Sequence, residues 1–161
     1  MTHDSIIPIS RPSERDLHEI RALVDAYAYA VDRRDEPMLA ALLTPDAALI
    51  RPASMVGAGQ HAALTGVRLP NEILAAVAHL RSTRHIVAQQ VLLGAGTATT
   101  VQAETYCTAH HIYGKGDAHR DNRLHVRYRD TFVRQDGRWW ISRRELLVDF
   151  IEDVPVTLPH P

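Results

Sequence analysis

The stretch LHVRYRDTFVRQDGRWWISRRELLVDF, residues 124–150, indicates the fold more directly than any other part of the sequence. In residues 124–133, apolar side chains alternate with mostly basic ones, as in a β-strand with one buried and one solvated face. Asp136-Gly137 is a strong signal for a tight hairpin turn, after which residues 139–150 return as a second strand. The sequence therefore predicts an antiparallel hairpin that packs one face against a core.

Asp130 is unusual within this hairpin because it is a carboxylate on an otherwise apolar strand face. Its neighbours on that face are Leu124, Val126, Tyr128 and Phe132. Buried carboxylates need hydrogen-bonding or ionic partners. Asp130 is therefore expected either to bond to the structure around it or to belong to a functional site.

Toward the N-terminus, strand signals give way to helix signals. Residues 86–93 and 97–112 predict two more strands, which complete a four-stranded antiparallel meander with the hairpin. Ser13 and Asp16 have the spacing of a helix start close to a capping box. Apolar residues then recur at helical spacing in one stripe: Ile20, Leu23, Val24, Tyr27 and Val31.

Shorter sequence patterns predict the remaining helices, strand and loops. Residues 37–43 and 72–80 predict two further helices, and residues 47–50 can form a short strand. Residues 51–66 and 114–122 are expected to be loops. The predicted fold class is therefore α+β, with three N-terminal helices packed on one face of a four-stranded antiparallel sheet.

Length and composition are those of one soluble domain. The chain of 161 residues fits a domain at 13–153, a flexible arm at 1–12 and a tail at 154–161. A net charge of −1 gives no sign of a nucleic-acid or membrane partner. The arm lacks the features of a signal peptide, and no apolar run reaches the roughly 20 residues of a membrane span. The single cysteine, Cys107, excludes an internal disulfide and favours a cytoplasmic location.

Two residue types allow alternative interpretations. Between Arg120 and Arg144 there are eight arginines and three aspartates, which is compatible with a nucleic-acid stripe. Aromatic residues for base stacking are sparse on that strand face, so a solvated sheet surface is the better interpretation. The ten histidines show neither His-x-His nor His-Glu-x-x-His spacing, so no metal site is predicted.

Three segments together resemble a known family: ALVDAYAYAVDRRDEPMLAALLTPDAAL (22–49), STRHIV (82–87) and YRDTFVRQDGRWWISRRELLVDF (128–150). They are similar to the SnoaL-like branch of the nuclear transport factor 2-like superfamily, over nearly the whole chain. The order and spacing of the segments carry the resemblance, since each motif is weak alone. The resemblance implies a curved antiparallel sheet that helices wrap into a cone, with an apolar pocket between them.

The resemblance also implies a working pair of residues. Dehydratases and dehydrochlorinases of this superfamily have an aspartate at the end of the first helix and a histidine entering the first long strand, which match Asp32 and His85. Asp32 would orient His85, which would act as general base. A carboxylate in the last helical turn is locally unfavourable. The alternatives are a solvated aspartate beside Arg33 and Arg34, and a histidine that is a surface residue or a satisfied core group.

Further site residues follow from the same resemblance. Tyr27 matches a catalytic tyrosine of one of these dehydratases, although a core aromatic is an equally good interpretation. His110 matches a further pocket histidine. Tyr106 and Tyr128 stand where relatives have an acidic group and an asparagine. Tyr27 is therefore grouped with Asp32 and His85 as a predicted catalytic residue, and the predicted substrate-binding residues are Tyr106, His110, Tyr128 and Asp130.

The face of the strand at 97–112 decides which of these residues can reach the pocket. Tyr106 and His110 share a face with Glu104 and Thr108. The resemblance implies that this face points into the pocket. His111 is then expected to point away from it.

The function implied by the resemblance is that of a cofactor-independent lyase or isomerase, with no metal. Its substrate would be a small, largely apolar, oxygenated molecule such as a polyketide, steroid or aromatic compound. Dehydration is the first expectation because the best residue matches are dehydratases; isomerisation or cyclisation would use the same groups. The alternative is a non-catalytic protein, either a ligand carrier or a partner subunit, because WWISRRELLVD (139–149) also resembles the small subunits of ring-hydroxylating dioxygenases.

The predicted partners are the small substrate and further copies of the chain. Trp139 and Trp140 alternate across the sheet, so one is expected in the core and the other at a subunit interface. Family members commonly associate through this sheet, which implies a homo-oligomer, dimer or trimer. Nucleic acid and membranes are not expected as partners.

Overall fold

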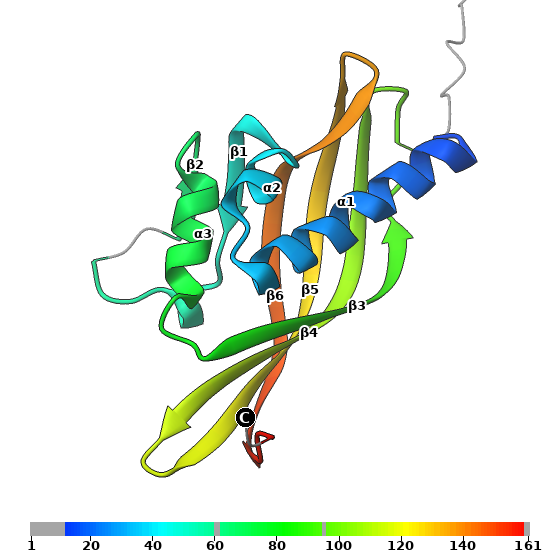
Figure 1. The fold of residues 1–161 in the computed structure, drawn as a ribbon. Helices are drawn as coiled ribbons and strands as arrows, with labels where there is room; N and C mark the ends of the chain where they lie inside the picture. Colours follow the sequence, from blue (N-terminus) through cyan, green and yellow to red (C-terminus); the bar gives the residue numbers. More distant parts are fainter. Residues whose placement is uncertain (1–11, 60–61, 95, 160–161) are drawn as a thin grey trace, which may run out of the picture.

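The computed structural model describes residues 12–59, 62–94 and 96–159, in which three helices lie against one face of a curved sheet of six strands (Figure 1). The helices are α1 (Glu14–Arg33), α2 (Glu36–Ala40) and α3 (Leu69–Val77). The strands are β1 (Leu43–Ile50), β2 (Ala63–Thr65), β3 (Ser82–Leu92), β4 (Thr100–Lys115), β5 (Ala118–Gln135) and β6 (Arg138–Val156), and Ala53–Met55 forms a short 3-10 helix. The predicted α+β class agrees with this architecture. The predicted arm at residues 1–12 lies outside the described residues except for Pro12.

The four long strands form the predicted antiparallel meander. The strand order is β2-β1-β6-β5-β4-β3, and each neighbouring pair from β3 to β6 is antiparallel. β1 pairs parallel to β6, and β2 pairs antiparallel to β1. The sequence predicted β1 only at residues 47–50 and placed β2 within a loop. A strand of three residues has too little alternation to be recognised locally, and both added strands depend on long-range pairing.

The long strands extend further than predicted. β4 and β5 continue through most of residues 114–122, predicted as a loop, and turn tightly at Gly116, whose positive φ of 60° suits a hairpin. β6 runs to Val156, paired with His119 of β5, so residues 154–156 belong to the sheet rather than to the predicted tail. The side chains at these strand ends are mostly exposed, and they therefore lack the alternation that marks a half-buried strand.

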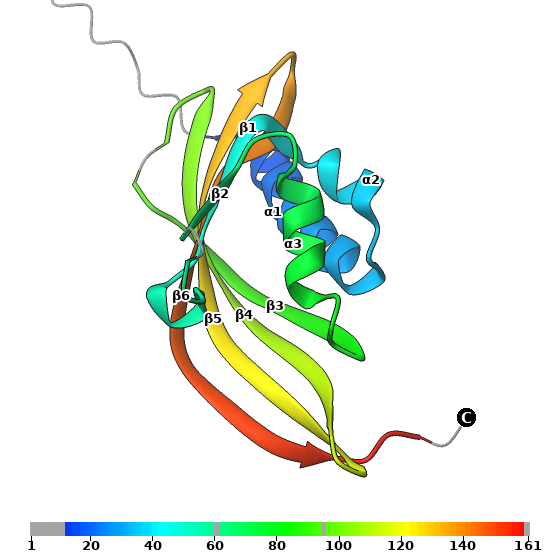
Figure 2. The ribbon, with the colours of Figure 1, turned by 90° about the vertical axis from the view of Figure 1, so that its left-hand side faces the viewer.

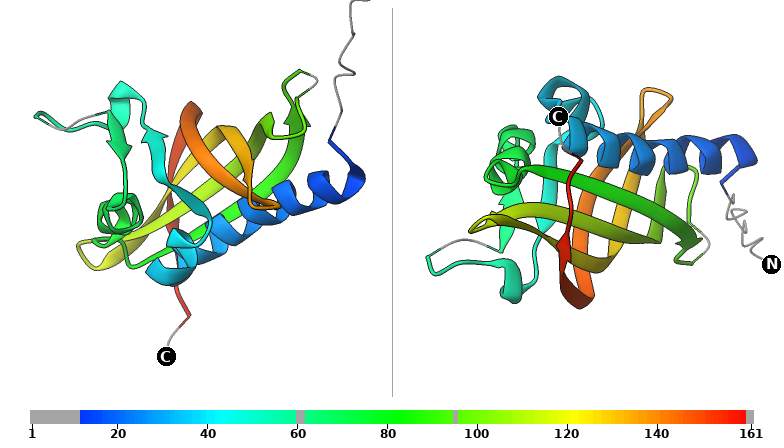
Figure 3. Two further views of the ribbon diagram at one scale, coloured as in Figure 1. Left: turned by 90° about the horizontal axis from the view of Figure 1, so that it is seen from above. Right: turned by 60° about the horizontal axis from the view of Figure 1, so that its bottom comes forward.

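α1 is fixed to the sheet in the way its sequence indicates. The predicted capping box is present: Ser13 Oγ accepts from the Asp16 N–H, and the Ser13 N–H donates to the Asp16 carboxylate. The predicted apolar stripe is buried: Ile20, Leu23, Val24, Tyr27 and Val31. α1 packs mainly against β3 and β6 and crosses the strands (Figure 3). This crossing brings the end of α1 to the first residues of β3.

The two shorter helices differ from their predicted bounds. α2 ends at Ala40 because Leu43 already begins β1. α3 begins at Leu69, earlier than the predicted start at residue 72, since Pro70 suits a first helical turn. No helix in the described part of the chain is long and apolar enough to cross a membrane.

The concave face of the sheet carries the helices and is called the inner face; the convex face is the outer face (Figure 2). The β5 side chains that alternation predicted to be inward are buried: Leu124, Val126, Tyr128, Asp130 and Phe132. Trp139 is buried in the core, as predicted for one of the two tryptophans. Trp140 is only partly buried, and the Arg138 guanidinium lies 4.1 Å from its ring centroid.

Candidate active site

Asp32 and His85 lie together where the end of α1 meets the start of β3. His85 Nδ1 is 2.7 Å from Asp32 Oδ1, and the backbone N–H of His85 donates to Asp32 Oδ2 at 2.8 Å. The Thr83 hydroxyl donates to Asp32 Oδ1 at 2.9 Å. Both carboxylate oxygens are therefore held, and the Asp32 side chain cannot turn without breaking these three contacts.

Arg34 supports this pair from behind. It follows α1 in the left-handed conformation, with φ of 57°, which turns its side chain toward β3 and α3. Its Nη1 donates to Thr83 Oγ1 at 2.8 Å and to the Val31 carbonyl at 2.7 Å. Its Nη2 donates to the Val77 carbonyl at 3.0 Å. Through Thr83, this cation offsets the unfavourable position of the Asp32 carboxylate in the last turn of a helix.

These contacts determine which nitrogen of His85 is free to act as a base. Burial raises the pKa of the Asp32 carboxyl, but hydrogen bonds from His85 and Thr83 outweigh burial and hold that pKa below its ordinary value. Asp32 is therefore ionised near neutral pH, and a carboxylate only accepts hydrogen bonds. Nδ1 of His85 must carry the hydrogen between them. In the neutral ring, Nε2 is then the unprotonated nitrogen.

His85 forms part of the wall of a small cavity of about 90 Å³, which we call the inner cavity. The side chain of His85 is 8% exposed. Most of the wall is apolar and includes Leu49, Leu64, Ile73, Leu124 and Leu146. The polar residues that line it with His85 are Tyr27, Arg51, His111 and Tyr128. Within residues 12–59, 62–94 and 96–159, no group of His, Cys, Asp or Glu side chains is arranged to hold a metal ion.

Tyr27 and Tyr128 are two predicted site residues that the structure places in this wall. Their ring centroids are 6.3 Å apart, with an edge-to-face angle of 65°. Burial raises the pKa of both phenols, so both keep their protons near neutral pH. Each phenol is therefore a possible hydrogen-bond donor to a ligand.

Asp130 lies outside the wall of the inner cavity. Its carboxylate accepts from Arg144 Nε at 2.8 Å and from Arg144 Nη2 at 2.7 Å, and both side chains are almost fully buried. The Arg144 Cζ atom also lies 4.0 Å from the ring centroid of Tyr27 and of Tyr128. Of the two alternatives for Asp130, the structure shows a structural partner. The predicted contact between Asp130 and substrate has no support.

His111 is a cavity residue that sequence reasoning missed. It was expected to point away from the pocket, yet it lines the inner cavity, with its ring centroid 6.0 Å from that of His85. Burial, together with the charge of a protonated His85, lowers the pKa of His111 to about 4. His111 is therefore neutral near pH 7 and offers a ligand one hydrogen-bond donor and one acceptor.

Tyr106 and His110 lie on the outer face, so their predicted place in the pocket is wrong. Tyr106 is 41% exposed. Ala109 of β4 pairs directly with the buried Leu124 of β5, and directly paired residues share a face. Alternate β4 residues counted from Ala109 therefore point inward, and the prediction was shifted by one residue. Such a shift moves every side chain of a strand to the other face.

The sequence of β4 does contain a signal for the correct face. Small or apolar residues occupy the inward positions: Val101, Ala103, Cys107 and Ala109. Polar residues occupy positions between them, including Gln102, Glu104 and Thr108. This alternation, extended by two residues, reaches His111 and not His110.

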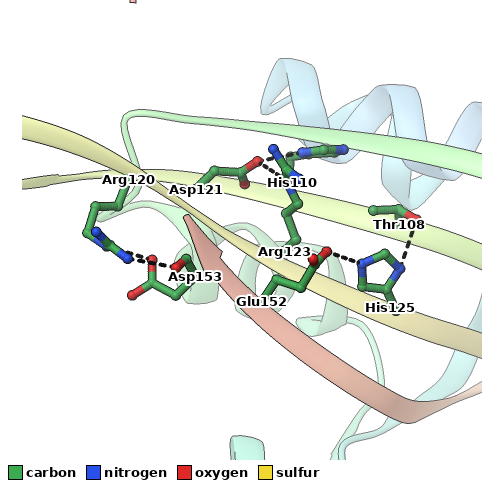
Figure 4. Close-up of polar contacts among 8 residues, drawn as sticks. All are labelled: Thr108, His110, Arg120, Asp121, Arg123, His125, Glu152 and Asp153. Atoms are coloured by element: carbon green, nitrogen blue, oxygen red, sulfur yellow. Dashed lines mark hydrogen bonds and ion pairs between the residues drawn. The ribbon is translucent and has the colours of Figure 1, made fainter. Parts of the chain in front are cut away.

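Figure 4 shows the surroundings of His110 on the outer face. His110 Nδ1 and Arg123 Nε both lie 2.7 Å from Asp121 Oδ2. Nearby, His125 Nε2 lies 2.8 Å from Glu152 Oε2. The sheet separates these side chains from the inner cavity, so His110 belongs to a surface network.

Fold and cavity together define an α+β protein whose helices and curved sheet line a mostly apolar cavity, with His85 in its wall and Asp32 bonded to His85. A family model described as a SnoaL-like domain matches residues 13–145. The chain belongs to the SnoaL-like family of the nuclear transport factor 2-like superfamily. No sequence among the curated proteins matches the chain.

Solved structures share this fold over most of their length. A candidate scytalone dehydratase from Novosphingobium aromaticivorans is 24% identical, with a TM-score of 0.72, over 91% of this chain and 93% of that chain. A LinA-type3 hexachlorocyclohexane dehydrochlorinase from Novosphingobium barchaimii is 17% identical, with a TM-score of 0.70, over 91% and 93%. A protein of unknown function with a cystatin-like fold from Nostoc punctiforme is 20% identical, with a TM-score of 0.69, over 87% and 96%. At these identities the similarity establishes the fold alone.

Proposed function

We propose that this protein is a cofactor-independent lyase or isomerase in which His85 removes a proton from carbon of a small, largely apolar, oxygenated substrate. A polyketide, steroid or aromatic compound would fit this description. The proposal depends on one observation: His85 lies in the wall of a mostly apolar cavity and contacts Asp32 at 2.7 Å. A histidine base with a carboxylate on its other nitrogen is the arrangement that general-base catalysis needs.

The proposed reaction begins at Nε2 of His85. This nitrogen accepts the proton, and the Asp32 carboxylate stabilises the resulting imidazolium through Nδ1–H. The electron pair of the broken C–H bond moves toward an oxygen of the substrate, where negative charge develops. Donors already aimed at such an oxygen lower the barrier because they need no reorganisation.

Three neutral donors line the cavity around His85: Tyr27, His111 and Tyr128. Both phenols keep their protons because burial raises their pKa, and His111 is neutral because burial lowers its pKa. Each can donate a hydrogen bond to the developing oxyanion. In a dehydration, one of these groups or the His85 imidazolium would return a proton to the leaving hydroxyl, which departs as water.

Dehydration is the first choice among the reactions that this site could perform. The solved structures with this fold include proteins named as a scytalone dehydratase and a dehydrochlorinase. Both names denote eliminations in which a proton and a leaving group are lost. Isomerisation would use the same base and the same donors, with the proton returned to a different carbon.

The test starts from the ligand that the protein itself retains. Native mass spectrometry of freshly purified protein identifies a bound compound, and the compound is then incubated with wild type and with His85→Ala. We expect turnover by wild type and a rate lower by about 10²–10⁴-fold in His85→Ala. Equal rates would remove His85 as the base. A compound that wild type binds and never converts would indicate a ligand carrier and contradict the enzyme proposal.

A further inference from the structure

The inner cavity is too small for the whole substrate. Its volume is about 90 Å³, whereas pockets that bury a complete small-molecule ligand typically measure roughly 300–1,000 Å³. If the proposed reaction occurs beside His85, only the reacting part of the substrate fits there. The remainder must occupy a neighbouring space.

A second cavity of about 530 Å³ adjoins the first, and we call it the outer cavity. The two cavities share wall residues Arg51, Leu64 and Ala76, so these side chains lie between the two spaces. The backbone N–H of Arg51 donates to the Ala62 carbonyl at 2.9 Å, which holds this residue between β1 and β2. Arg51 therefore stands at the junction of the two spaces.

The outer cavity has a positively charged wall. Its charged lining residues are Arg51, Arg68 and Glu72, two cations against one anion, in a chain whose net charge is −1. Arg68 is exposed and forms no ion pair with any other residue that the structure describes. The remaining lining is small or apolar, including Leu64 and Ala75. Guanidinium groups bind carboxylates, phosphates and sulfates through paired, charge-assisted hydrogen bonds.

We infer that the substrate carries an anionic group that binds between Arg51 and Arg68 in the outer cavity while its apolar, reacting end enters the inner cavity beside His85. This inference rests on the proposed function for the reacting end. It narrows the substrate class from apolar oxygenated molecules to amphipathic ones with a carboxylate, phosphate or sulfate at one end. Arg51 and Arg68 would then set the depth to which the substrate enters.

The test compares two dyes that differ only in charge. Anilinonaphthalene sulfonate and N-phenylnaphthylamine share the same aromatic body, and only the first has a sulfonate. We expect wild type to bind the sulfonate dye about tenfold more tightly. Arg68→Gln should weaken the sulfonate dye about fivefold and leave the neutral dye within about twofold, with a similar change for Arg51→Gln. Ala76→Trp, which fills the junction, should weaken both dyes.

Arg143→Gln is the matched control, because it removes the same charge from an exposed residue of β6 and should leave both affinities unchanged. Equal affinity of the two dyes for wild type, an equal effect of Arg143→Gln, or full binding of both dyes by Ala76→Trp would each overturn the inference. The dye measurements need no turnover and can be repeated in His85→Gln. Charge-selective binding without His85-dependent turnover would refute only the reaction, and His85-dependent turnover of an uncharged ligand would refute only the anionic group.

Discussion

Asp32 is a carboxylate in the last turn of α1, where the helix dipole disfavours a negative charge. Hydrogen bonds from neighbouring residues offset this cost. Thr83 and His85 supply three donors to its two oxygens. Arg34 in turn donates to the Thr83 hydroxyl. The hydroxyl therefore sits between a cation and an anion, and its orientation is set by both. A small change to the Thr83 side chain should therefore alter the pKa of the Asp32 carboxyl.

Thr83→Val tests this coupling, since it removes the hydroxyl and preserves the shape of the side chain. We expect the pKa of Asp32 to rise and the free energy of unfolding to fall by about 1 kcal/mol. NMR titration of the labelled Asp32 carboxyl and urea unfolding measure the two effects. Thr108→Val, on the outer face, is the control. An unchanged Asp32 pKa would show that Thr83 does not act on this carboxylate.

His111 gives the protein a specific response to acid. Its pKa is lowered from 6.5 to about 4 in the folded protein, whereas the unfolded chain has the ordinary value. Between these values the unfolded state binds a proton that the folded state rejects, so stability falls as pH falls from about 6.5 to about 4. The loss from this residue should reach roughly 3 kcal/mol at the lower end.

Urea unfolding across this pH range measures the effect, and NMR of the imidazole reports its titration directly. We expect His111→Gln to lose most of this slope, while His18→Gln, on the exposed side of α1, keeps it. Titration of the His111 ring near pH 6.5 in the folded protein would contradict the expectation. It would also place a positive charge in the inner cavity at mildly acidic pH.

Part of the candidate site could be predicted from the sequence. The pairing of Asp32 with His85 came from a family resemblance, since the helical pattern places Asp32 only at the flank of the apolar stripe. The roles of Arg34 and Thr83 could not be predicted, because they depend on the left-handed conformation of Arg34, which turns its side chain toward β3 and α3. His111 was missed because the resemblance favoured its neighbour His110 over the alternation of β4.

Among the elements, α1 is hydrogen-bonded to the sheet near both of its ends: Asp32 in its last turn bonds to β3, and Asp16 in its first turn bonds to β6. Its first turn uses Asp16 twice: the carboxylate completes the cap with Ser13 and accepts from Trp139 Nε1 at 2.8 Å. The hydrogen bond from Trp139, followed by those from Ser13, lowers the pKa of Asp16 to about 2. A helix cap and a buried indole therefore depend on one carboxylate.

Asp16→Ala should destabilise the protein by about 2 kcal/mol, because it removes the cap and leaves the buried Trp139 N–H without a partner. The stabilisation that the ionised Asp16 carboxylate provides is present above its ordinary pKa of 3.8 and is lost as pH falls toward about 2. Urea unfolding at neutral and acidic pH measures both. Glu14→Ala, in the same turn, should cost less than about 0.5 kcal/mol. Similar losses in the two variants would indicate that Asp16 acts only as a first-turn charge.

Element boundaries were predictable where one face of an element is buried and unpredictable elsewhere. α1 and the inward set of β5 follow their apolar periodicity. β2 and the far ends of β4, β5 and β6 have mostly exposed side chains, and only pairing with distant strands defines them. Local pattern therefore could not distinguish these segments from loops.

For the molecule as a whole, the Asp130–Arg144 pair is a charged contact at the centre of an apolar core. Arg144 reaches Asp130 on β5 and packs on the ring of Tyr27 from α1, so it joins helix and sheet. Buried ion pairs contribute little net stability, yet breaking one leaves an uncompensated charge. The pair therefore makes the core depend on both partners being present.

Arg144→Met should lower the free energy of unfolding by about 3–5 kcal/mol, because Asp130 is left buried without a counter-ion. Adding Asp130→Leu should restore about 2 kcal/mol or more of that loss, since no charge then remains. Urea unfolding of the two variants and wild type measures both steps. A double variant no more stable than Arg144→Met would mean that the tyrosine contacts of Arg144, and not its charge, hold the core.

The layered α+β architecture was predictable at this largest scale, because helix signals precede strand signals along the chain. The parallel pairing of β1 with β6 was not, since it joins residues about a hundred positions apart without a local signature. The cavity lies beside this pairing, as Leu49 of β1 and Leu146 of β6 both line it. The space available to a ligand therefore depends on a contact that the sequence pattern does not reveal.

The proposed role of His85 is tested most directly by the turnover rates of two histidine variants. His85→Gln removes the base beside Asp32, and His110→Gln removes the histidine that lies across the sheet on the outer face. With the compound that the protein retains as substrate, we expect His85→Gln to lower the rate by about 10²–10⁴-fold and His110→Gln to stay within about twofold of wild type. Equal rates in the two variants, or a larger loss in His110→Gln, would contradict general-base catalysis by His85.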